Sequence, residues 1–165
     1  MTRLLGVDLG TRRVGLAIGD TQTGSVVPLA TIARSDLARD GRTIARVAVE
    51  QRVDELVVGL PLNMDGTEGA QAQSTREWAL AIADLCGLDV AWRDERLTTE
   101  DASARIGRPP RGRSGGAPSG SARRSHRARL DRLAAAAIVQ VEMDARLAQG
   151  ARTDATNSSA GGDAA

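Results

Sequence analysis

One carboxylate lies inside a segment whose pattern otherwise indicates buried β-structure. Residues 4–20 (LLGVDLGTRRVGLAIGD) form two alternating runs around a Gly10-Thr11 turn, and Asp8 projects from the face opposite its larger apolar neighbours. Because an unpaired, ionised carboxylate is costly to bury, Asp8 must meet a cation or lie at the open end of the sheet. Two interpretations remain open: Asp8 is a metal ligand, or it accepts hydrogen bonds from the turn backbone.

Asp94 and Glu95, in the motif WRDERLTT, stand where a strand ends and a helix begins. Ligands of open α/β sheets usually bind at such positions. Successive strand residues point to opposite faces, so we expect only one of the two acids to join Asp8. The alternative is that these acids form ion pairs with Arg93 or Arg96.

Asp131, in RLDRLAAAAIVQ, is the polar start of an otherwise buried stripe on a helix. An alanine-rich helix can approach a sheet closely, and the face that holds Gly15, Ala17 and Gly19 has the smallest side chains. We expect this packing to bring Asp131 toward Asp8. The alternative is that Asp131 only stabilises the dipole at the start of its helix.

Three converging carboxylates would repel one another unless cations neutralised them. Hard oxygen ligands suit Mg²⁺ or Mn²⁺. Two such ions roughly 3.5 to 4 Å apart can activate a water molecule and stabilise the leaving oxygen of a phosphodiester. The chemistry that these residues favour is therefore metal-dependent hydrolysis of phosphodiester bonds.

All 22 basic residues are arginines, and their distribution is uneven. Eight lie between residues 105 and 130, where there is no Asp or Glu, so the rest of the chain has 14 arginines against 21 acids and a net charge of −7. Arginine suits phosphate because its planar fork can bond it in bidentate fashion. Compositional bias would explain the choice of arginine, but not the clustering. We expect nucleic-acid contacts at Arg111, Arg113, Arg123 and Arg124.

The length and composition limit the class of protein. A chain of 165 residues suggests one domain, which is too short for the two-lobed actin-like ATPases whose first phosphate loop DLGTRRVGLAI also resembles. Cys86 is the only cysteine, which excludes an internal disulfide and a cysteine-cluster metal site. No apolar run approaches the roughly 20 residues of a membrane span, and the first residues lead directly into a strand, so we expect a cytoplasmic protein.

Hydrophobic periodicity predicts the elements that position these residues. The fold class is α/β, a mixed five-stranded sheet with an antiparallel meander, two parallel strands and helices on both faces. The expected strands lie within 4–20 and over 26–32, 55–60 and 90–95, and the expected helices begin near 35–36, include Trp78, Ile82 and Leu85, run from 98–99 to 106 and span 128–149. Residues 107–127, rich in Gly, Pro, Ser and Arg, predict a flexible loop, and 150–165 a disordered tail.

Four motifs resemble the YqgF family, bacterial proteins similar to the Holliday-junction resolvase RuvC and built on the ribonuclease H fold. VDLGTRRVGLAIGD, VVGLPLNMDGTEG, DERLTT and LDRLAAAAIVQ stand in that family's order and approximate spacing, over about residues 3–147. The resemblance implies a ribonuclease H-like nuclease domain over 1–149. It implies a metal-dependent nuclease that processes the 5′ end of pre-16S ribosomal RNA, with Holliday-junction cleavage as the alternative. Together with the carboxylate chemistry above, this leads us to expect two Mg²⁺ or Mn²⁺ ions.

The family's acidic residues, carried over by motif, fall on Asp8, Glu95 and Asp131, with Asp94 as the second choice in place of Glu95. Arg12 and Arg96 adjoin these carboxylates and are candidates for phosphate contact, or each neutralises a neighbouring acid. One departure is the loop before Asp131, because the family usually has a compact lysine-rich segment there.

Two other functions compete with a nuclease. The main rival is a nucleic-acid-binding factor that uses the fold without cleaving. The three carboxylates argue against it, because a pure binder would gain by losing negative charge near a phosphate backbone. An actin-like nucleotide switch is disfavoured by the length of the chain and by the lack of a second phosphate loop. The expected partner is therefore nucleic acid, most of all pre-rRNA or branched DNA, and not a membrane.

Overall fold

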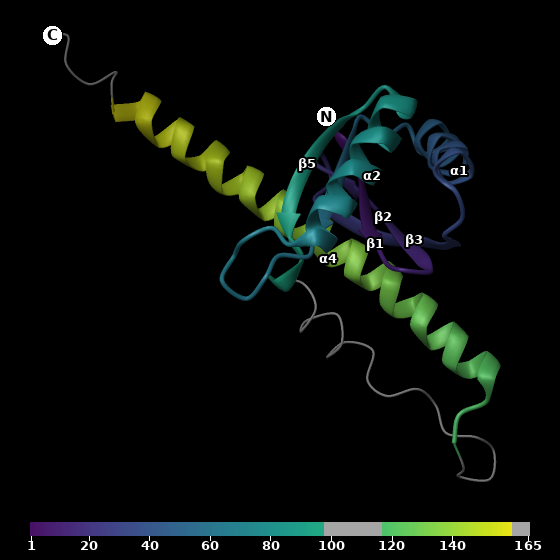
Figure 1. Ribbon diagram of the computed structural model, residues 1–165. Coiled ribbons are helices and arrows are strands. Elements are labelled where there is room, and N and C mark those ends of the chain that lie inside the picture. Colours follow the sequence, from purple (N-terminus) through teal and green to yellow (C-terminus); the bar gives the residue numbers. More distant parts are fainter. Residues whose placement is uncertain (98–116, 160–165) are drawn as a thin grey trace, which may run out of the picture.

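The computed structural model describes residues 1–97 and 117–159. It contains a five-stranded sheet in the order β3-β2-β1-β4-β5, with helices on both faces (Figure 1), which confirms the predicted fold class. The strands are β1 (Arg3–Leu9), β2 (Arg13–Asp20), β3 (Ser25–Ala33), β4 (Glu55–Leu60) and β5 (Asp89–Asp94). The helices are α1 (Leu37–Glu50), α2 (Ala70–Cys86), the short 3₁₀ helix η1 (Glu95–Leu97) and α4 (Gly120–Ser159).

The sheet combines an antiparallel meander with parallel strands. β1 pairs antiparallel with β2, and β2 with β3, whereas β4 runs parallel to both β1 and β5. The carboxyl ends of β1, β4 and β5 therefore meet at the same edge of the sheet. Residues that follow these three strands are brought together there, although they lie far apart in the sequence.

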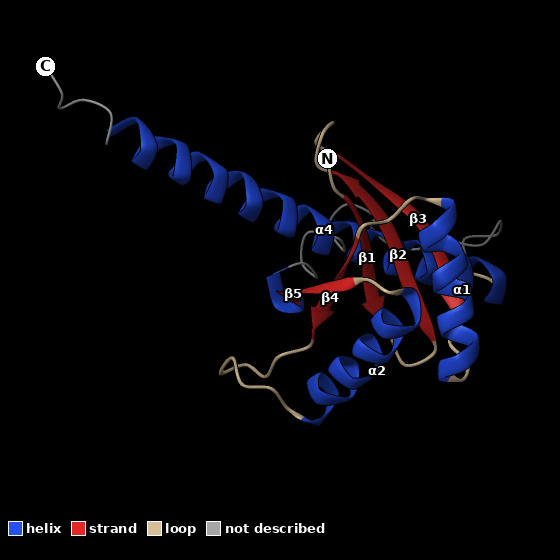
Figure 2. Cartoon of the chain, turned by 90° about the horizontal axis from the view of Figure 1, so that it is seen from above, coloured by secondary structure: helices blue, strands red, loops and turns tan. Residues whose placement is uncertain are grey.

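Helices lie on both faces of the sheet (Figure 2), and an apolar layer holds them against each face. α1 and α2 cover one face through a core that includes Leu5, Val7, Leu16, Ile44 and Ile82. α4 covers the other face through a smaller core of Leu4, Ala17, Val57, Ala135, Ile138, Val139 and Met143. The alternation of β1 and β2 decides which residues enter which layer, so the even-numbered residues of β1 face α4.

The long helix α4 corrects the predicted boundaries. It begins at Gly120 and ends at Ser159, so the predicted loop is wrong for 120–127 and the predicted disordered tail is wrong for 150–159. The hydroxyl of Ser119 accepts a hydrogen bond from the Ala122 N–H at 3.1 Å, and the alanines and arginines that follow are strong helix formers. The expected helix over 98–106 and the loop residues 107–116 lie outside the described residues.

The predicted apolar stripe of α2 is also partly wrong. Trp78 and Ile82 are buried in the core. Leu85 is 58% exposed and lies beside Gly41 of α1 instead of entering the core. The predicted start of α1 is confirmed, since the Asp36 side chain accepts a hydrogen bond from the Arg39 N–H at 2.8 Å and caps the helix. Within 1–97 and 117–159, no helix is long and apolar enough to cross a membrane.

Candidate active site

Asp8 lies on the face of the sheet that α4 covers. It belongs to β1, where it pairs with Gly15 of β2, and its even-numbered neighbours Leu4 and Gly6 contact α4. Because Asp8 is the last even-numbered residue of its strand, its carboxylate sits at the edge where β1 ends. It is partly buried, in a position that a central strand holds rigidly.

Asp131 reaches the same place from α4. Gly15 has no side chain, and a Cβ atom built there would collide with the backbone oxygen of Asp131. The helix backbone therefore lies directly on β2 at this point, as the small-residue face predicts. Since Gly15 is the cross-strand neighbour of Asp8, the contact brings Asp131 beside Asp8.

Glu95 completes the acidic group and comes directly after β5. It follows β5 as the first residue of η1, on the α4 side of the sheet. Its Cβ lies 3.7 Å from the position that a Cβ at Gly59 would take, and the same position at Gly59 contacts Ile138 of α4. Thus Asp8, Glu95 and Asp131, which come from β1, η1 and α4, share one end of one face.

Burial and neighbouring negative charges act on two of these carboxylates, Asp8 and Glu95. Burial, followed by the charges of Glu95 and Asp131, raises the pKa of Asp8 from 3.8 to about 7. Burial, followed by the charge of Asp94, also raises the pKa of Glu95. Such a group favours any cation that can enter it, because a cation would remove both the desolvation cost and the repulsion.

Arg13 is the functional neighbour that the sequence analysis missed. Its Nε donates to the Asp131 Oδ2 at 2.5 Å, and this hydrogen bond raises the pKa of Arg13. The pattern contains the signal, because Arg13 stands two residues before Gly15 and so points to the same face. Among the described residues, no group of three or more His, Cys, Asp or Glu side chains is placed so that it could hold a metal ion, and the Asp131 carboxylate is turned toward Arg13.

Asp94 lies on the opposite face and has a different partner. Its strand neighbours Val90 and Trp92 pack against the core under α1 and α2, and its carboxylate forms an ion pair with Arg96 at 2.6 Å. Hydrogen bonds from Arg96 lower the pKa of Asp94. Arg96 also donates to the backbone oxygens of Asn63 (3.0 Å) and Met64 (3.1 Å), which ties the loop after β4 to the end of β5. The sequence left two roles open for Arg96, a contact with phosphate or the neutralisation of a neighbouring acid, and the structure shows the second.

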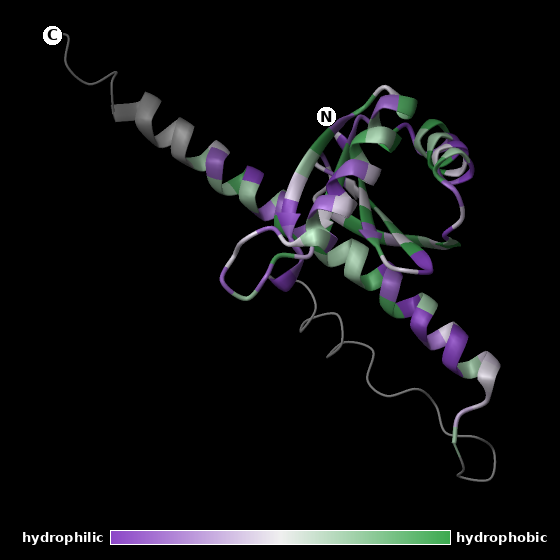
Figure 3. Cartoon of the chain, in the orientation of Figure 1, coloured by the Kyte–Doolittle hydropathy of each residue, from purple (hydrophilic) through white to green (hydrophobic). Residues whose placement is uncertain are grey.

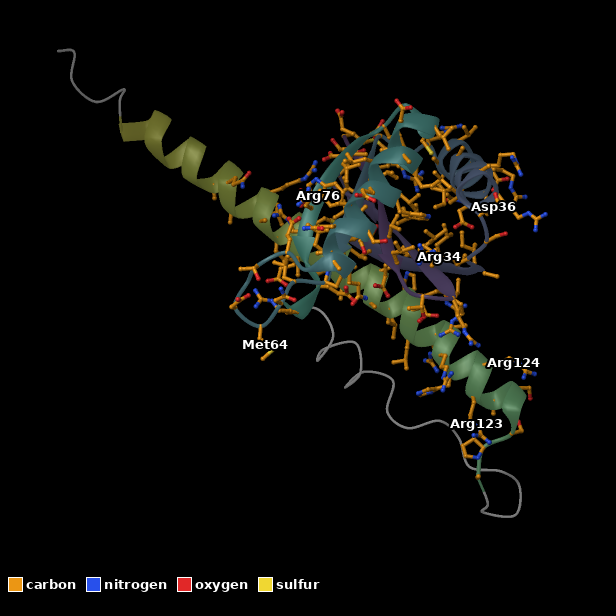
Figure 4. All side chains as sticks on the ribbon, in the orientation of Figure 1. Arg34, Asp36, Met64, Arg76, Arg123 and Arg124 are labelled. Carbon is orange, nitrogen blue, oxygen red and sulfur yellow. The ribbon has the colours of Figure 1, made fainter. Side chains whose placement is uncertain are left out.

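Basic residues surround the acidic group on one side. A pocket of about 300 Å³ is lined by Gly10, Thr11, Arg12, Arg13, Arg127 and Asp131. Arg123 and Arg124 are exposed further out, on the first turns of α4, where the helix projects beyond the sheet (Figure 4). The same end of α4 is hydrophilic, whereas the part that crosses the sheet is apolar (Figure 3). Arg111 and Arg113 lie outside the described residues.

Comparisons with known proteins converge on one family. Residues 2–145 match a family described as "RuvX: Holliday junction resolvase". A protein of Anaeromyxobacter sp. (strain K), named "Putative pre-16S rRNA nuclease", is 40% identical over 144 residues, which are 87% of this chain and 98% of that protein. A protein of the same name from Rhodobacter capsulatus is 43% identical over 96 residues, which are 58% of this chain and 60% of that protein.

The fold has a counterpart among solved structures. The structure of Thermus thermophilus RuvC has a TM-score of 0.52 and 17% sequence identity, covering 89% of this chain and 97% of that one. A second structure of the same protein, in complex with a Holliday junction substrate, has a TM-score of 0.51. At this identity the likeness shows the fold alone, which is ribonuclease H-like.

Proposed function

Because this chain belongs to the RuvX family, which is the YqgF family that its motifs resemble, we propose that it is a metal-dependent nuclease that hydrolyses phosphodiester bonds. We propose that its substrate is the 5′ end of pre-16S rRNA, processed in the cytoplasm during ribosome biogenesis, as the names of its relatives suggest. One observation supports the enzymatic function: three carboxylates from separate elements share one end of the sheet, where burial and the charges of Glu95 and Asp131 raise the pKa of Asp8.

The residues fit a divalent cation in their chemistry. Asp8, Glu95 and Asp131 offer hard oxygen ligands, and their burial and mutual repulsion favour a cation among them. We propose that they would hold Mg²⁺ or Mn²⁺, with two ions for the full site. When bound, such ions lower the pKa of a water nucleophile and stabilise the charge on the leaving oxygen.

The chain's own residues supply position and charge. β1 holds Asp8, the close contact at Gly15 fixes the backbone of Asp131, and η1 sets Glu95 beside Gly59. Arg13 restrains the Asp131 carboxylate in the free protein. The nearby arginines attract the phosphate backbone, which the negative group would otherwise repel.

Two alternatives have specific support. The family description names Holliday junction resolution, so branched DNA is the second candidate substrate. A non-catalytic binding factor would use the same arginines, but it would have no use for the buried acids. A nuclease and a binding factor differ in one measurable property: only the nuclease shows cleavage that depends on both the metal and Asp8.

A gel assay separates these readings. Purified protein is incubated with structured RNA, single-stranded RNA and four-way DNA junctions, each with Mg²⁺, Mn²⁺ or EDTA. We expect metal-dependent cleavage of RNA by the native chain. Asp8→Asn should abolish it while leaving affinity equal or higher, because the change removes a metal ligand and a charge that repels phosphate.

Two further variants sharpen the assay. Asp144→Asn is the matched control, because Asp144 is exposed on α4 and, within the described residues, accepts its hydrogen bond from the Gln140 side chain. Asp94→Asn should keep activity, since Asp94 faces the other side of the sheet. Loss of cleavage in Asp94→Asn would exchange the roles of Asp94 and Glu95. Equal cleavage by the native chain and Asp8→Asn would assign the activity to a contaminating nuclease and would favour the binding factor.

A further inference from the structure

A pocket of about 300 Å³ adjoins the acidic group, and three elements line it, of which β2 contributes Arg13. The turn between β1 and β2 contributes Gly10, Thr11 and Arg12, and α4 contributes Arg127 and Asp131. Arg127 precedes Asp131 by four residues, so both side chains leave the same side of α4. The pocket therefore opens between the turn and the helix, next to the proposed carboxylates.

The walls of the pocket are held in place before any ligand arrives. The Gly10 N–H donates to the Arg13 backbone oxygen at 2.8 Å, and the Arg34 N–H donates to the Arg12 backbone oxygen at 2.9 Å. On the helix side, the hydroxyl of Thr31 donates to the Ala128 backbone oxygen at 2.6 Å. These contacts fix the backbone on both sides, so that little ordering is needed on binding.

The charge of the pocket selects an anion. Three arginines face one aspartate in its lining, which leaves two positive charges in excess. Arg13 is paired with Asp131 at 2.5 Å. Within the part of the chain that the structure describes, Arg12 and Arg127 have no ion-pair partner, so their guanidinium groups are available to a ligand. A phosphate suits them, because arginine can bond it through two parallel N–H groups.

We propose that this pocket binds a backbone phosphate of the nucleic-acid strand, and that Arg13 passes from Asp131 to this phosphate when the strand binds. The proposal rests on the proposed function, which makes the ligand a nucleic acid. Asp131 belongs both to the pocket and to the acidic group around Asp8, so the phosphate held here lies next to the bond that is cut. Strand binding then releases the Asp131 carboxylate toward Asp8 and Glu95.

The first experiment measures binding without metal. A fluorescently labelled single-stranded RNA of six uridines is titrated in EDTA at several salt concentrations, and its anisotropy is followed. The double variant Arg12→Gln/Arg127→Gln should bind about tenfold more weakly, and the slope of log K against log salt should fall by about 0.7 for one lost phosphate contact. Affinity and slope equal to those of the native chain would overturn the phosphate site.

The matched control removes two arginines on the other side of the sheet. Arg42 and Arg46 are exposed on α1, which packs on the face opposite α4. Arg42→Gln/Arg46→Gln lowers the net charge of the chain by the same amount and should leave affinity within about twofold, because distant exposed charges are largely screened at 0.15 M salt. An equal loss in both double variants would show a general charge effect and would also overturn the site.

The second experiment tests the exchange of partners by Arg13. Binding of Mn²⁺ to the RNA-free protein is measured by electron paramagnetic resonance. Arg13→Gln should bind Mn²⁺ several times more tightly, because Asp131 is released, and yet bind the uridine RNA more weakly in EDTA. Arg13→Lys, which keeps the charge but loses the guanidinium fork, should lie between the two. Unchanged affinity for Mn²⁺ in Arg13→Gln would overturn the exchange.

Arg12→Gln is the control for Mn²⁺ binding, since it removes a nearby charge that does not pair with Asp131. It should change the affinity for Mn²⁺ less than Arg13→Gln does, and an equal change would overturn the exchange. Failure of the proposed function is a separate result. A protein that cleaves no substrate but loses RNA binding in the double variant has the phosphate site without the nuclease. A protein that cleaves through Asp8 but binds equally well in the double variant is a nuclease without this site.

Discussion

Asp8 shows how a single residue can be unfavourable for folding and still be required by a site. Its carboxylate lies on a central strand, partly buried, and its two acidic neighbours push its pKa up along with burial. The cost disappears when a cation enters or when the carboxylate takes up a proton. The residue therefore links the stability of the protein to pH and to metal.

The pH dependence of stability follows from the sign of this shift. Because the pKa of Asp8 rises from 3.8 to about 7 on folding, the folded chain holds the proton more tightly, and stability falls as pH increases between these values. Asp8→Asn should be more stable than the native chain at pH 8 in EDTA, by at most about 4 kcal/mol, and the difference should close near pH 4. Urea unfolding at the two pH values measures it, and a constant difference would contradict the shift.

Metal should reverse that order. Adding Mg²⁺ or Mn²⁺ at pH 8 should raise the melting temperature of the native chain, because a ligand that binds only the folded state stabilises it. Asp8→Asn should respond much less, since it has lost a carboxylate from the proposed site. Equal shifts in both proteins would place the metal elsewhere.

At the scale of the elements, two features position α4: glycines of the sheet, which leave room for the helix backbone, and one buried charged residue of the helix. Gly6, Gly15 and Gly19 let the helix approach β1 and β2, and Glu142, only 3% exposed, forms ion pairs with Arg93 of β5 and Arg146 of its own helix. Arg146 also pairs with Glu55 of β4 at 2.7 Å. The helix is therefore fixed at both ends of its contact with the sheet.

Gly15→Ala tests the close approach. The added methyl group would meet the backbone of Asp131, which cannot rotate away, so we expect a loss of about 2 to 3 kcal/mol in the free energy of unfolding and a displaced Asp131. Gly150→Ala is the matched control, because nothing lies within 4 Å of the added group and alanine is the better helix former. Calorimetry of both variants measures the difference, and equal melting temperatures would refute the tight contact.

Glu142→Gln tests the buried charge. It would leave Arg93 and Arg146 without their shared anion, and breaking a buried ion pair from one side costs about 3 kcal/mol or more. RNA binding in EDTA should not change, because the network lies away from the arginine-lined pocket. Asp144→Asn, on the exposed side of the same helix, serves as the control, and equal stability of the two variants would assign Glu142 no structural role.

At the scale of the whole molecule, charge is divided between an acidic body and the arginine-rich segment 105–130, whose residues from Gly120 onward belong to α4. Arg123 and Arg124 belong to the exposed first turns of α4, beyond the edge of the sheet (Figure 4). Replacing Arg111, Arg113, Arg123 and Arg124 with Ser should weaken nucleic-acid binding and flatten its salt dependence without changing sequence preference, because phosphate contacts carry no sequence information. An unchanged salt slope would leave the body as the only binding surface.

The sequence predicted what depends on strand alternation. That pattern placed Asp8 on the face of Gly15, and it separated Asp94 from Glu95, because a two-residue period needs no knowledge of distant partners. It did not predict the start of α4, because a segment rich in Gly, Ser and Arg is typical of a loop. In the structure Ser119 caps the helix, and the arginines favour it. It also missed the pairing of Arg13 with Asp131, 118 residues apart, since this depends on how α4 lies across the sheet.

The length of α4 has a geometric consequence. Its 40 residues rest on the sheet only through the middle of the helix, and Arg123 lies two turns, about 12 Å, ahead of Asp131 on the same rod. The helix is held on the sheet at Gly15 and through the ion pairs of Glu142, so the outer turns project from a seat that is fixed at two points. The outer turns therefore act as a spacer, because an anion bound by Arg123 would stand about two helical turns from the acidic group.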